Sequence, residues 1–436
     1  MITYELRLAA MSFRKNPILT SLMVAAVALG IGVCMTTLTL YYLMSDNPIP
    51  HKSDQLFAVQ LDSWDPNNGY GNSDEDYPEQ LTWNDAQNLL HQSPDYPQVS
   101  MFKTAMVIET DNVEQPPSRE RGRVTSRDFF SMFDIGFKYG DVWSQNMEDA
   151  AQQVVVLSDK LNETLFGGEN STGRMLRLDD ELYEIVGVLE HWQPAITFYD
   201  VNNGAFDEPE DFYLPLTLAP VLEINNYGNT NCWKDVEGEG YSAFLNSECI
   251  WTQYWVELPD EAAVAEYQGF LEAYFMEQKA MGRFGRPMGV RLSNVEEWLD
   301  LNNVVGNDSR VLLGLAFMFL AVCVFNTIGL LLTKFLGRAN ETGLRRALGA
   351  TRAMIFRQHL VEVGSIGLVG GMIGIGLAWI GLRGVDRVAN LPDAIVQLNT
   401  ELVLIAVSIA VGATLLAGLY PSWHIGRIAP ARYLKT

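Results

Sequence analysis

The sequence predicts a membrane protein that combines α-helices with mixed α/β structure. We expect four transmembrane helices, with one large extracytoplasmic α/β domain of two subdomains between the first helix and the second. Three observations lead to this fold class. Four long runs are almost entirely apolar, positive charge gathers in short segments beside these runs, and a long acidic segment carries strand and helix patterns.

The four apolar runs are Ile18–Leu43, Val311–Leu332, Val363–Leu382 and Leu402–Tyr420. A helix needs about 20 apolar residues to cross the hydrocarbon core of a membrane. We therefore expect transmembrane helices at 18–44, 309–335, 352–382 and 401–420. Buried helices of a large soluble protein are the less favoured alternative. The first run is about twice as long as the apolar core of a signal peptide, so we expect an uncleaved anchor.

Lysine and arginine predict the orientation in the membrane. The segments 1–17, 334–357 and 421–436 carry 12 of the 30 Lys and Arg residues, whereas 45–308 holds 15 of them against 47 Asp and Glu. Short cytoplasmic segments are enriched in Lys and Arg. We therefore expect an amphipathic cytoplasmic lead at 1–17 and a cytoplasmic tail at 421–436, so that both termini are cytoplasmic. The acidic domain and a short loop at 383–400 then lie outside.

The acidic segment has a net charge of −32 and a mixed α/β pattern. A surface of this sign excludes nucleic acid and anionic lipid headgroups as binding partners. Short apolar runs such as Val154–Leu157 indicate strands, and they gather between about 119 and 205. We expect that stretch to form a strand-rich subdomain inserted into the first. Apolar positions at helical spacing in "DEAAVAEYQGFLEAYFMEQK" predict a helix.

No enzyme site stands out in the chain. Its five histidines are scattered without metal-ligand spacing, and the sequence contains neither G-x-S-x-G nor G-x-x-x-x-G-K-[ST]. If the protein is energised by ATP, the ATPase is therefore another chain or lies outside these 436 residues. The loop at 62–80 is rich in Asp and Asn but lacks the register of a calcium loop, so we interpret it as a solvated loop, with a metal site as the alternative.

The four cysteines divide between the membrane and the acidic domain. Cys34 and Cys323 lie in apolar runs, where we expect them to fill small apolar spaces. Cys232 and Cys249 flank a polar, glycine-containing stretch of the external domain, where disulfides persist. We predict a disulfide between Cys232 and Cys249; two separately buried thiols are the alternative.

A basic bridge, "KFLGRANETGLRRALGATRAMIFRQHLVE", joins the second apolar run to the third. Asn340 can cap a short helix there, Gly349 is placed to end it in the left-handed conformation, and Thr351 can cap the next helix. Glu341 lies favourably at the positive end of the short helix. We therefore expect a rigid amphipathic helix at 336–351 followed by a corner. A basic anchor that only obeys the positive-inside rule is the alternative, but it needs no such start and stop signals.

The predicted membrane helices hold almost no ionisable residues, whereas a hydrophilic translocation path would show some. Asn326 and Thr327 are the main polar pair in the second helix, and we expect packing hydrogen bonds from them, with a substrate path as the alternative. The third run holds seven glycines, including Gly370 and Gly374, whose spacing permits close helix contact. Tight packing favours force transmission over a wide pore.

The stretch "FNTIGLLLTKFLGRANETGLRRALGATRAMIFRQHLVE" closely resembles part of the MacB/FtsX-type ABC transporter permeases, the type VII exporter superfamily that includes LolC and LolE. In that family this stretch forms the coupling helix that docks on the ATPase. Thr342 stands where the family has an aliphatic residue, which softens one apolar contact. "NPILTSLMVAAVALGIGV", "VVVLSDKLNETLFGGENSTGRMLRLDDELYEIVGVLE" and "GLYPSWHIGRIAPARYLK" also resemble the family. By this resemblance the residues that couple to the ATPase are Glu341, Gly343, Leu344, Arg345, Arg346, Ala347, Leu348, Gly349, Ala350, Thr351 and Arg352.

The resemblance implies a permease subunit of the bacterial inner membrane, with a MacB-like periplasmic domain at 45–308 and no fused ATPase. No cofactor is expected in this chain, because ATP and Mg are bound by the partner ATPase. The implied partners are an ABC ATPase dimer, a second permease chain that is identical or paralogous, and the lipid bilayer. The loop at 62–80 and the region between Cys232 and Cys249 depart most from the family.

The resemblance implies mechanotransmission, in which ATP-driven closure of the ATPases moves the membrane helices and changes the periplasmic domain. Export or efflux with a membrane-fusion protein and an outer-membrane channel is the leading expectation. The alternative is a permease-like sensor or regulator, which acts in lipoprotein release or in the control of cell-wall hydrolases.

Overall fold

The computed structural model describes residues 13, 15–71, 73, 76–109, 116–389 and 400–426. Most of the expected lead at 1–17, loop at 383–400 and tail at 421–436 lies outside the described residues. The chain forms two compact units. One is helical and combines Met1–Asp46 with Val305–Thr436; the other, Asn47–Val304, is called the α/β domain below.

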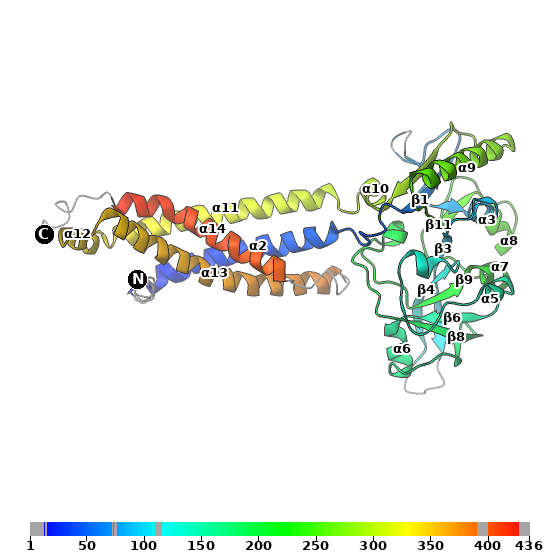
Figure 1. The fold of residues 1–436 in the computed structure, drawn as a ribbon, viewed down its shortest axis with the longest axis horizontal. Helices are drawn as coiled ribbons and strands as arrows, with labels where there is room; N and C mark the ends of the chain where they lie inside the picture. Colours follow the sequence, from blue (N-terminus) through cyan, green and yellow to red (C-terminus); the bar gives the residue numbers. More distant parts are fainter. Residues whose placement is uncertain are drawn as a thin grey trace. The chain divides into compact units, whose positions relative to one another are not determined.

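The helical unit is a bundle of long helices with one short helix at an end of it (Figure 1). The long helices are α2 (Pro17–Met44), α11 (Asn307–Leu336), α13 (Arg352–Ala389) and α14 (Thr400–Gly426), and the short one is α12 (Ala339–Ala347). Among the described residues, four helices are long and apolar enough to cross a membrane, with candidate spans at Pro17–Met44, Ser309–Leu336, Arg352–Val385 and Val403–Ile425. The expected four spans are therefore present.

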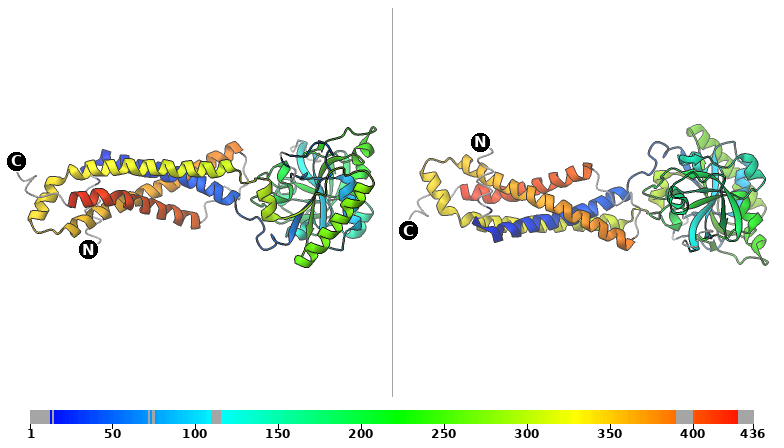
Figure 2. Two further views of the ribbon diagram at one scale, coloured as in Figure 1. Left: turned by 90° about the horizontal axis from the view of Figure 1, so that it is seen from above. Right: turned by 90° about the horizontal axis from the view of Figure 1, so that it is seen from below.

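Helix α2 packs mainly against α13 and α11, with a smaller contact to α14 (Figure 2). Half of the apolar stretch of α2 is buried within the helical unit, whereas only 22% of the apolar stretch of α11 is buried. Most of the α11 surface is consequently left to lipid or to another chain. Cys34 and Cys323 are buried free thiols in α2 and α11, as expected from their place in the apolar runs.

The α/β domain contains one 12-stranded sheet with helices packed on it. Its strands are β1 (Leu56–Leu61), β2 (Leu81–Thr82), β3 (Gln98–Glu109), β4 (Ser118–Thr125), β5 (Phe137–Gly140), β6 (Val154–Leu157), β7 (Met175–Leu178), β8 (Glu181–Leu189), β9 (Phe212–Pro215), β10 (Asn231–Cys232), β11 (Cys249–Glu257) and β12 (Val290–Asn294). Its helices are α3 (Trp83–Gln92), α4 (Phe129–Met132), α5 (Gln145–Asp149), α6 (Asp159–Phe166), η1 (Phe198–Asn203), η2 (Leu216–Leu218), α7 (Ala219–Leu222), α8 (Tyr241–Leu245), α9 (Glu261–Ala280) and α10 (Val295–Leu301).

Six of these strands close into a ring. The pairings run β3–β4–β9–β6–β8–β7 and return to β3, with β4–β9 and β6–β8 parallel and the other pairs antiparallel. One face of these strands is apolar. Its side chains pack into one cluster, to which the strands contribute residues such as Phe102, Val155, Ile185 and Phe212. Closure leaves no free edge in this part of the sheet. The ring combines β4, β6, β7 and β8, which cover the stretch predicted to be rich in strands, with β3 before that stretch and β9 after it.

A second lobe continues the sheet through β3, β11, β1 and β12. Helix α9 covers it with Tyr267, Leu271, Tyr274 and Phe275, which are buried at helical spacing. Asp260 caps this helix by accepting a hydrogen bond from the Ala263 N–H. The ring and this second lobe share β3, whose 12 residues pair with β11 at one end and with β4 along the rest.

A buried arginine attaches the segment after β8 to the ring. Arg123 Nη2 donates to Asp200 Oδ2 at 2.7 Å and also pairs with Glu210, and all three side chains are at most 4% exposed. The guanidinium lies 4.8 Å from the centre of the Tyr199 ring. Because a buried charge needs partners, this cluster holds η1 against the outer face of β4.

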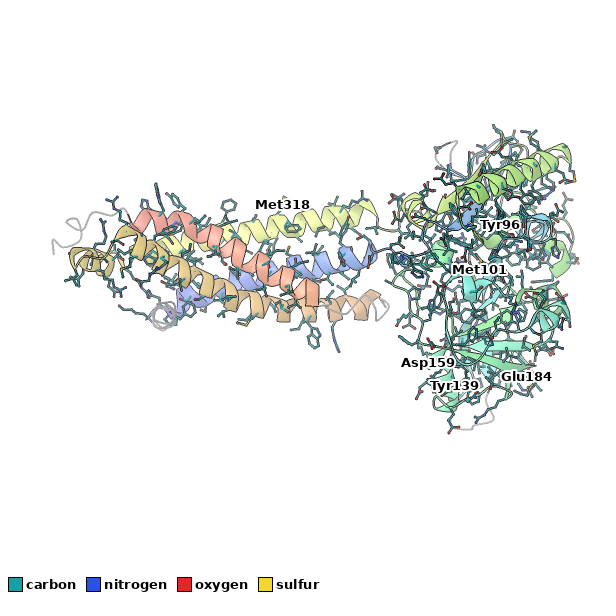
Figure 3. The ribbon with its side chains drawn as sticks, in the orientation of Figure 1. Tyr96, Met101, Tyr139, Asp159, Glu184 and Met318 are labelled. Atoms are coloured by element: carbon teal, nitrogen blue, oxygen red, sulfur yellow. A yellow bond between two sulfur atoms is a disulfide. The ribbon has the colours of Figure 1, made fainter. Side chains whose placement is uncertain are left out.

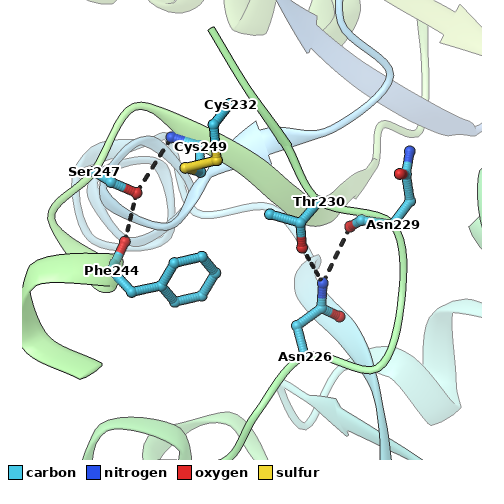
Figure 4. Close-up of a disulfide and its surroundings, with 7 residues drawn as sticks. All are labelled: Asn226, Asn229, Thr230, Cys232, Phe244, Ser247 and Cys249. Carbon is cyan, nitrogen blue, oxygen red and sulfur yellow. Dashed lines mark hydrogen bonds between the residues drawn. A yellow bond between two sulfur atoms is a disulfide. The ribbon is translucent and has the colours of Figure 1, made fainter. Parts of the chain in front are cut away.

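The disulfide predicted between Cys232 and Cys249 is present (Figure 4). The two cysteines lie directly opposite each other in the antiparallel pair β10–β11. The Ser247 hydroxyl donates to the Phe244 carbonyl and accepts from the Cys249 N–H, which closes the turn before β11. The bridge therefore ties the polar stretch around α8 to the sheet.

Glu148 is a carboxylic acid in an apolar site of the α/β domain. Its side chain is 7% exposed, and it accepts a hydrogen bond from Trp143 Nε1 at 3.4 Å. Burial disfavours the charged form and raises the pKa of Glu148 to about 7, although the Trp143 hydrogen bond opposes the shift. The pKa in the folded protein is therefore higher than that of an unfolded chain. The folded state is stabilised below about pH 4.5, and this contribution is lost as the pH rises through about 7.

We predict that Glu148→Gln raises the free energy of unfolding at pH 8 by up to about 3 kcal/mol and changes it little at pH 4, because glutamine keeps the acceptor without the charge. The measurement is urea unfolding of the full chain in detergent, followed by tryptophan fluorescence at both pH values. Glu277→Gln, at an exposed site of α9, is the matched control. If the free energy of unfolding differs between pH 4 and pH 8 by the same amount in Glu148→Gln as in the wild type, the prediction is contradicted.

Candidate coupling site at the end of the helix bundle

Helix α12 lies between α11 and α13 and is joined to each by a short link. Gly337 and Arg338 form the first link, and Arg338 occupies the capping position without a side-chain capping bond. The prediction that Asn340 caps this helix is wrong. Helical structure resumes at Ala339, directly after the two-residue link, so Asn340 already lies within the first turn.

The end of α12 has the geometry expected from the sequence. Gly349 adopts a φ of 102°, its N–H donates to the Arg346 carbonyl at 3.1 Å, and the Ala350 N–H donates to the Arg345 carbonyl at 3.0 Å. This pair of bonds is a Schellman motif, which stops a helix at a left-handed residue. Thr351 then caps α13 by accepting from the Met354 N–H at 3.2 Å. The predicted stop and restart are therefore confirmed.

The two faces of α12 differ in character. Ala339, Thr342 and Gly343 are buried against the bundle, so the one departure from the family pattern faces inward. Leu344 and Leu348 are 53% and 79% exposed, one helical turn apart. The outward face therefore combines two exposed leucines with charge, a combination typical of a protein-binding surface.

The other residues expected to couple to the ATPase surround this face. Ala347, Gly349, Thr351 and Arg352 are exposed, Arg346 and Ala350 are half-buried, and exposed Arg345 donates to Gln358 Oε1 at 2.8 Å. Glu341, in the first turn of α12, forms an ion pair with Lys15. This hydrogen-bonded partner lowers the pKa of Glu341. The site is thus an ordered surface whose charges are partly paired.

A cluster of ionisable side chains lies behind α12, and we call it the Glu362 cluster; it consists of Thr20, Lys334, Arg338, His359 and Glu362. Lys334 Nζ donates to Glu362 Oε1 at 2.8 Å and to Thr20 Oγ1 at 3.1 Å. The same carboxylate oxygen lies 3.7 Å from Arg338 Nη1, and His359 Nδ1 lies 3.7 Å from Glu362 Oε2. The Lys334 and Glu362 side chains are 0% and 4% exposed.

This cluster is not among the sequence predictions. Lys334 follows the end of the second apolar run and Glu362 precedes the start of the third, and both fall inside the transmembrane helices expected at 309–335 and 352–382. The structure places them inside candidate spans and buries them together. Removing one partner of a buried ion pair costs about 3–5 kcal/mol, because the other charge is left unpaired. The sequence does show opposite charges, Lys334 and Glu362, at the adjoining ends of the second and third apolar runs, and this pattern could have indicated the pair.

Close helix packing extends from this end through the bundle. A Cβ atom on Gly370 would lie 2.8 Å from Val27 Cγ1, and one on Gly374 would lie 2.9 Å from Ile31 Cβ. Gly370 and Gly374 therefore sit directly against α2. A second glycine row, Gly367 and Gly371, faces α14. The spacing of that second row was also visible in the sequence but was not singled out.

Asn326 does not take the packing role expected for it. Its side chain is exposed on α11, whereas neighbouring Thr327 is buried and donates to the Cys323 carbonyl at 2.8 Å. One residue corresponds to about 100° around a helix, so the two adjacent side chains point in different directions, and on α11 it is Thr327 that faces the bundle. Met318 on the same helix points away from the other helices and is 60% exposed (Figure 3).

The α/β domain offers a cleft lined by charged side chains. A cavity of about 440 Å³ is lined by Arg119, Arg121 and Lys160 together with Thr164 and Asp211. Burial raises the pKa of Asp211 to about 6. The Thr164 hydroxyl donates to the Lys160 carbonyl at 2.9 Å. In the parts of the chain that the structure describes, no group of His, Cys, Asp and Glu could hold a metal ion.

Two family models match this chain. The MacB-like periplasmic core domain matches residues 20–274, and the FtsX-like permease C-terminal domain matches residues 313–430. The chain belongs to the MacB/FtsX family of ABC transporter permeases. The resemblance noted in the sequence is therefore confirmed, and the protein is a membrane protein with a periplasmic-type domain.

Several curated relatives share this assignment. The ABC transporter permease YknZ of Bacillus subtilis is 21% identical over 70% of this chain and 68% of its own length. The pyoverdine export ATP-binding/permease protein PvdT of Pseudomonas aeruginosa is 24% identical over 68% of this chain and 39% of its own. The macrolide export ATP-binding/permease protein MacB of Syntrophobacter fumaroxidans is 22% identical over 68% of this chain and 44% of its own length. This chain thus spans less than half of the PvdT and MacB lengths.

Solved structures of the same kind of domain are also similar. The periplasmic region of MacB from Actinobacillus actinomycetemcomitans is 16% identical, with a TM-score of 0.36, over 59% of this chain and 96% of that one. The extracellular domain of YknZ from Gram-positive bacteria is 13% identical, with a TM-score of 0.34, over 55% of this chain and 100% of that one.

We predict that Gly370→Leu destabilises the bundle by about 1–3 kcal/mol, because the added side chain must displace Val27 or separate two packed helices. The expected readout is a lower melting temperature of the detergent-purified full chain. Gly376→Leu is the matched control, since a Cβ atom at that position of α13 meets no atom within 4 Å. Equal melting temperatures for the two variants contradict the packing described for Gly370.

Proposed function

We propose that this chain is the permease component of an exporter in which an ABC ATPase docks on α12 and drives conformational change in the α/β domain. The observation that carries the proposal is the surface of α12. Its two outward leucines, Leu344 and Leu348, are exposed on a helix with a fixed stop at Gly349. An exposed apolar pair on a short, well-anchored helix supports a protein partner at this position.

Mechanotransmission is the mode of coupling that the bundle supports best. The glycine rows of α13 bring backbone against α2 and α14, which makes the helices move as a packed unit. Helices α2 and α11 are the two that lead directly along the chain into the α/β domain. A push on α12 can therefore reach that domain through helices, without a water-filled path.

The distribution of charge supports the orientation. The basic segments that flank the spans favour a cytoplasmic α12 and cytoplasmic termini, and the acidic α/β domain favours the periplasmic side of the bacterial inner membrane. ATP and Mg then bind to the ATPase on the cytoplasmic side. We include a second permease chain, a periplasmic adaptor and an outer-membrane channel among the proposed partners. The export functions in the printed names of PvdT and MacB support this assembly.

We predict that Leu348→Asp weakens binding of the cognate ATP-binding subunit by about tenfold or more, because a charge would be buried in an apolar contact. The measurement is titration of that ATPase against the full-length permease in lipid nanodiscs, together with its permease-stimulated ATPase rate.

Leu301→Asp is the control for this experiment. Leu301 is 47% exposed in the α/β domain, far along the chain from α12, so the same change is expected to leave ATPase binding intact. Wild-type affinity and stimulation in Leu348→Asp would show that the ATPase docks elsewhere.

A further inference from the structure

The Glu362 cluster connects four helices at one point. Glu362 belongs to α13, Lys334 to the last turn of α11, Thr20 to the first turn of α2, and Arg338 stands at the start of α12. One carboxylate oxygen of Glu362 lies within 2.8 Å of Lys334 Nζ and 3.7 Å of Arg338 Nη1. The cluster therefore joins the coupling helix to all three of its neighbours.

The contact with α2 is the informative one. Helix α12 is continuous with α11 through Gly337 and Arg338, and with α13 through the corner at Gly349, but it has no direct chain connection to α2. Glu341 of α12 pairs with Lys15, just before α2, but both side chains of that pair are at least half exposed. The buried route runs instead through α11, where Lys334 Nζ donates to Thr20 Oγ1 of α2 at 3.1 Å. Helix α2 is also the most buried helix of the bundle and one of the two that continue into the α/β domain.

Burial makes these contacts difficult to break. Lys334 and Glu362 are almost fully enclosed, and separation of the pair would leave a charge without water or a partner. The Phe13 ring lies 5.5 Å from Lys334 Nζ, and the Phe335 ring packs on His359 with centroids 4.1 Å apart. Aromatic side chains thus enclose the charges and leave them little room to rearrange. A displacement of α12 would therefore move the cluster as a whole.

We propose that Glu362, Lys334 and Thr20 are positioning residues that transmit the displacement of α12 to α2 and α11. Arg338 moves with the start of α12, Glu362 follows Arg338, and Lys334 carries the shift across to Thr20. This inference rests on the proposed function, since it assumes that an ATPase moves α12. It adds that docking and transmission are carried by different residues, with docking on the outward face of α12 and transmission behind it.

The test separates docking from transmission in the full-length permease, reconstituted with its ATP-binding subunit in lipid nanodiscs. Thr20→Val removes the acceptor for Lys334 with almost no change in shape, and Glu362→Gln removes the central charge. Thr327→Val is the matched control, because Thr327 is equally buried but donates only to the Cys323 carbonyl of its own helix. The two readouts are the affinity for the ATPase and the ATP-dependent change in amide hydrogen exchange of the α/β domain.

We expect Thr20→Val and Glu362→Gln to bind the ATPase with wild-type affinity while the ATP-dependent change in exchange falls by at least about fivefold. Thr327→Val is expected to match the wild type in both readouts. Thr20→Val keeps the Lys334–Glu362 pair, so it tests the inference even if Glu362→Gln fails to fold.

Two results overturn the inference while leaving the proposed function in place. One is a wild-type exchange response in Thr20→Val. The other is a loss of ATPase affinity in Thr20→Val, which would make the cluster a support for the docking surface. If instead the wild-type protein shows no ATPase binding and no exchange response, the proposed function itself has failed, and the inference fails with it.

Discussion

The buried carboxylate of Glu362 is the constraint on which the arrangement of the helical unit most depends. A charge enclosed among membrane helices must be paired, and Glu362 is paired by cations from α11 and from the start of α12. Lys334 in turn requires the Thr20 hydroxyl of α2. Four helix ends are thereby held in one geometry, which places the outward face of α12 in a defined position for a partner.

The rest of the bundle depends on shape rather than on charge. In an apolar solvent, helices associate through close contact of small residues, and α13 presents glycines to α2 on one face and to α14 on another. The two kinds of contact are complementary. The ionic contact is specific and lies behind α12, whereas the glycine contacts are distributed along α13 and keep the helices together.

The α/β domain is held together in a different way. Closure of six strands into a ring removes free edges, and the Arg123 cluster and the Cys232–Cys249 bridge fix the segments that lie outside the ring. Strand β3 belongs to both lobes and joins them through a shared backbone.

The sequence by itself determined the four spans, the α/β domain, the disulfide and the Gly349 stop, because apolar length, strand patterns, cysteine placement and a left-handed glycine are local signals. Only the tertiary structure decided that Asn326 is exposed, that Asn340 is not a cap and that Lys334 meets Glu362 and Thr20. The physical reason is that rotation about a helix axis and pairing between helices depend on how several elements pack together, which no single segment encodes.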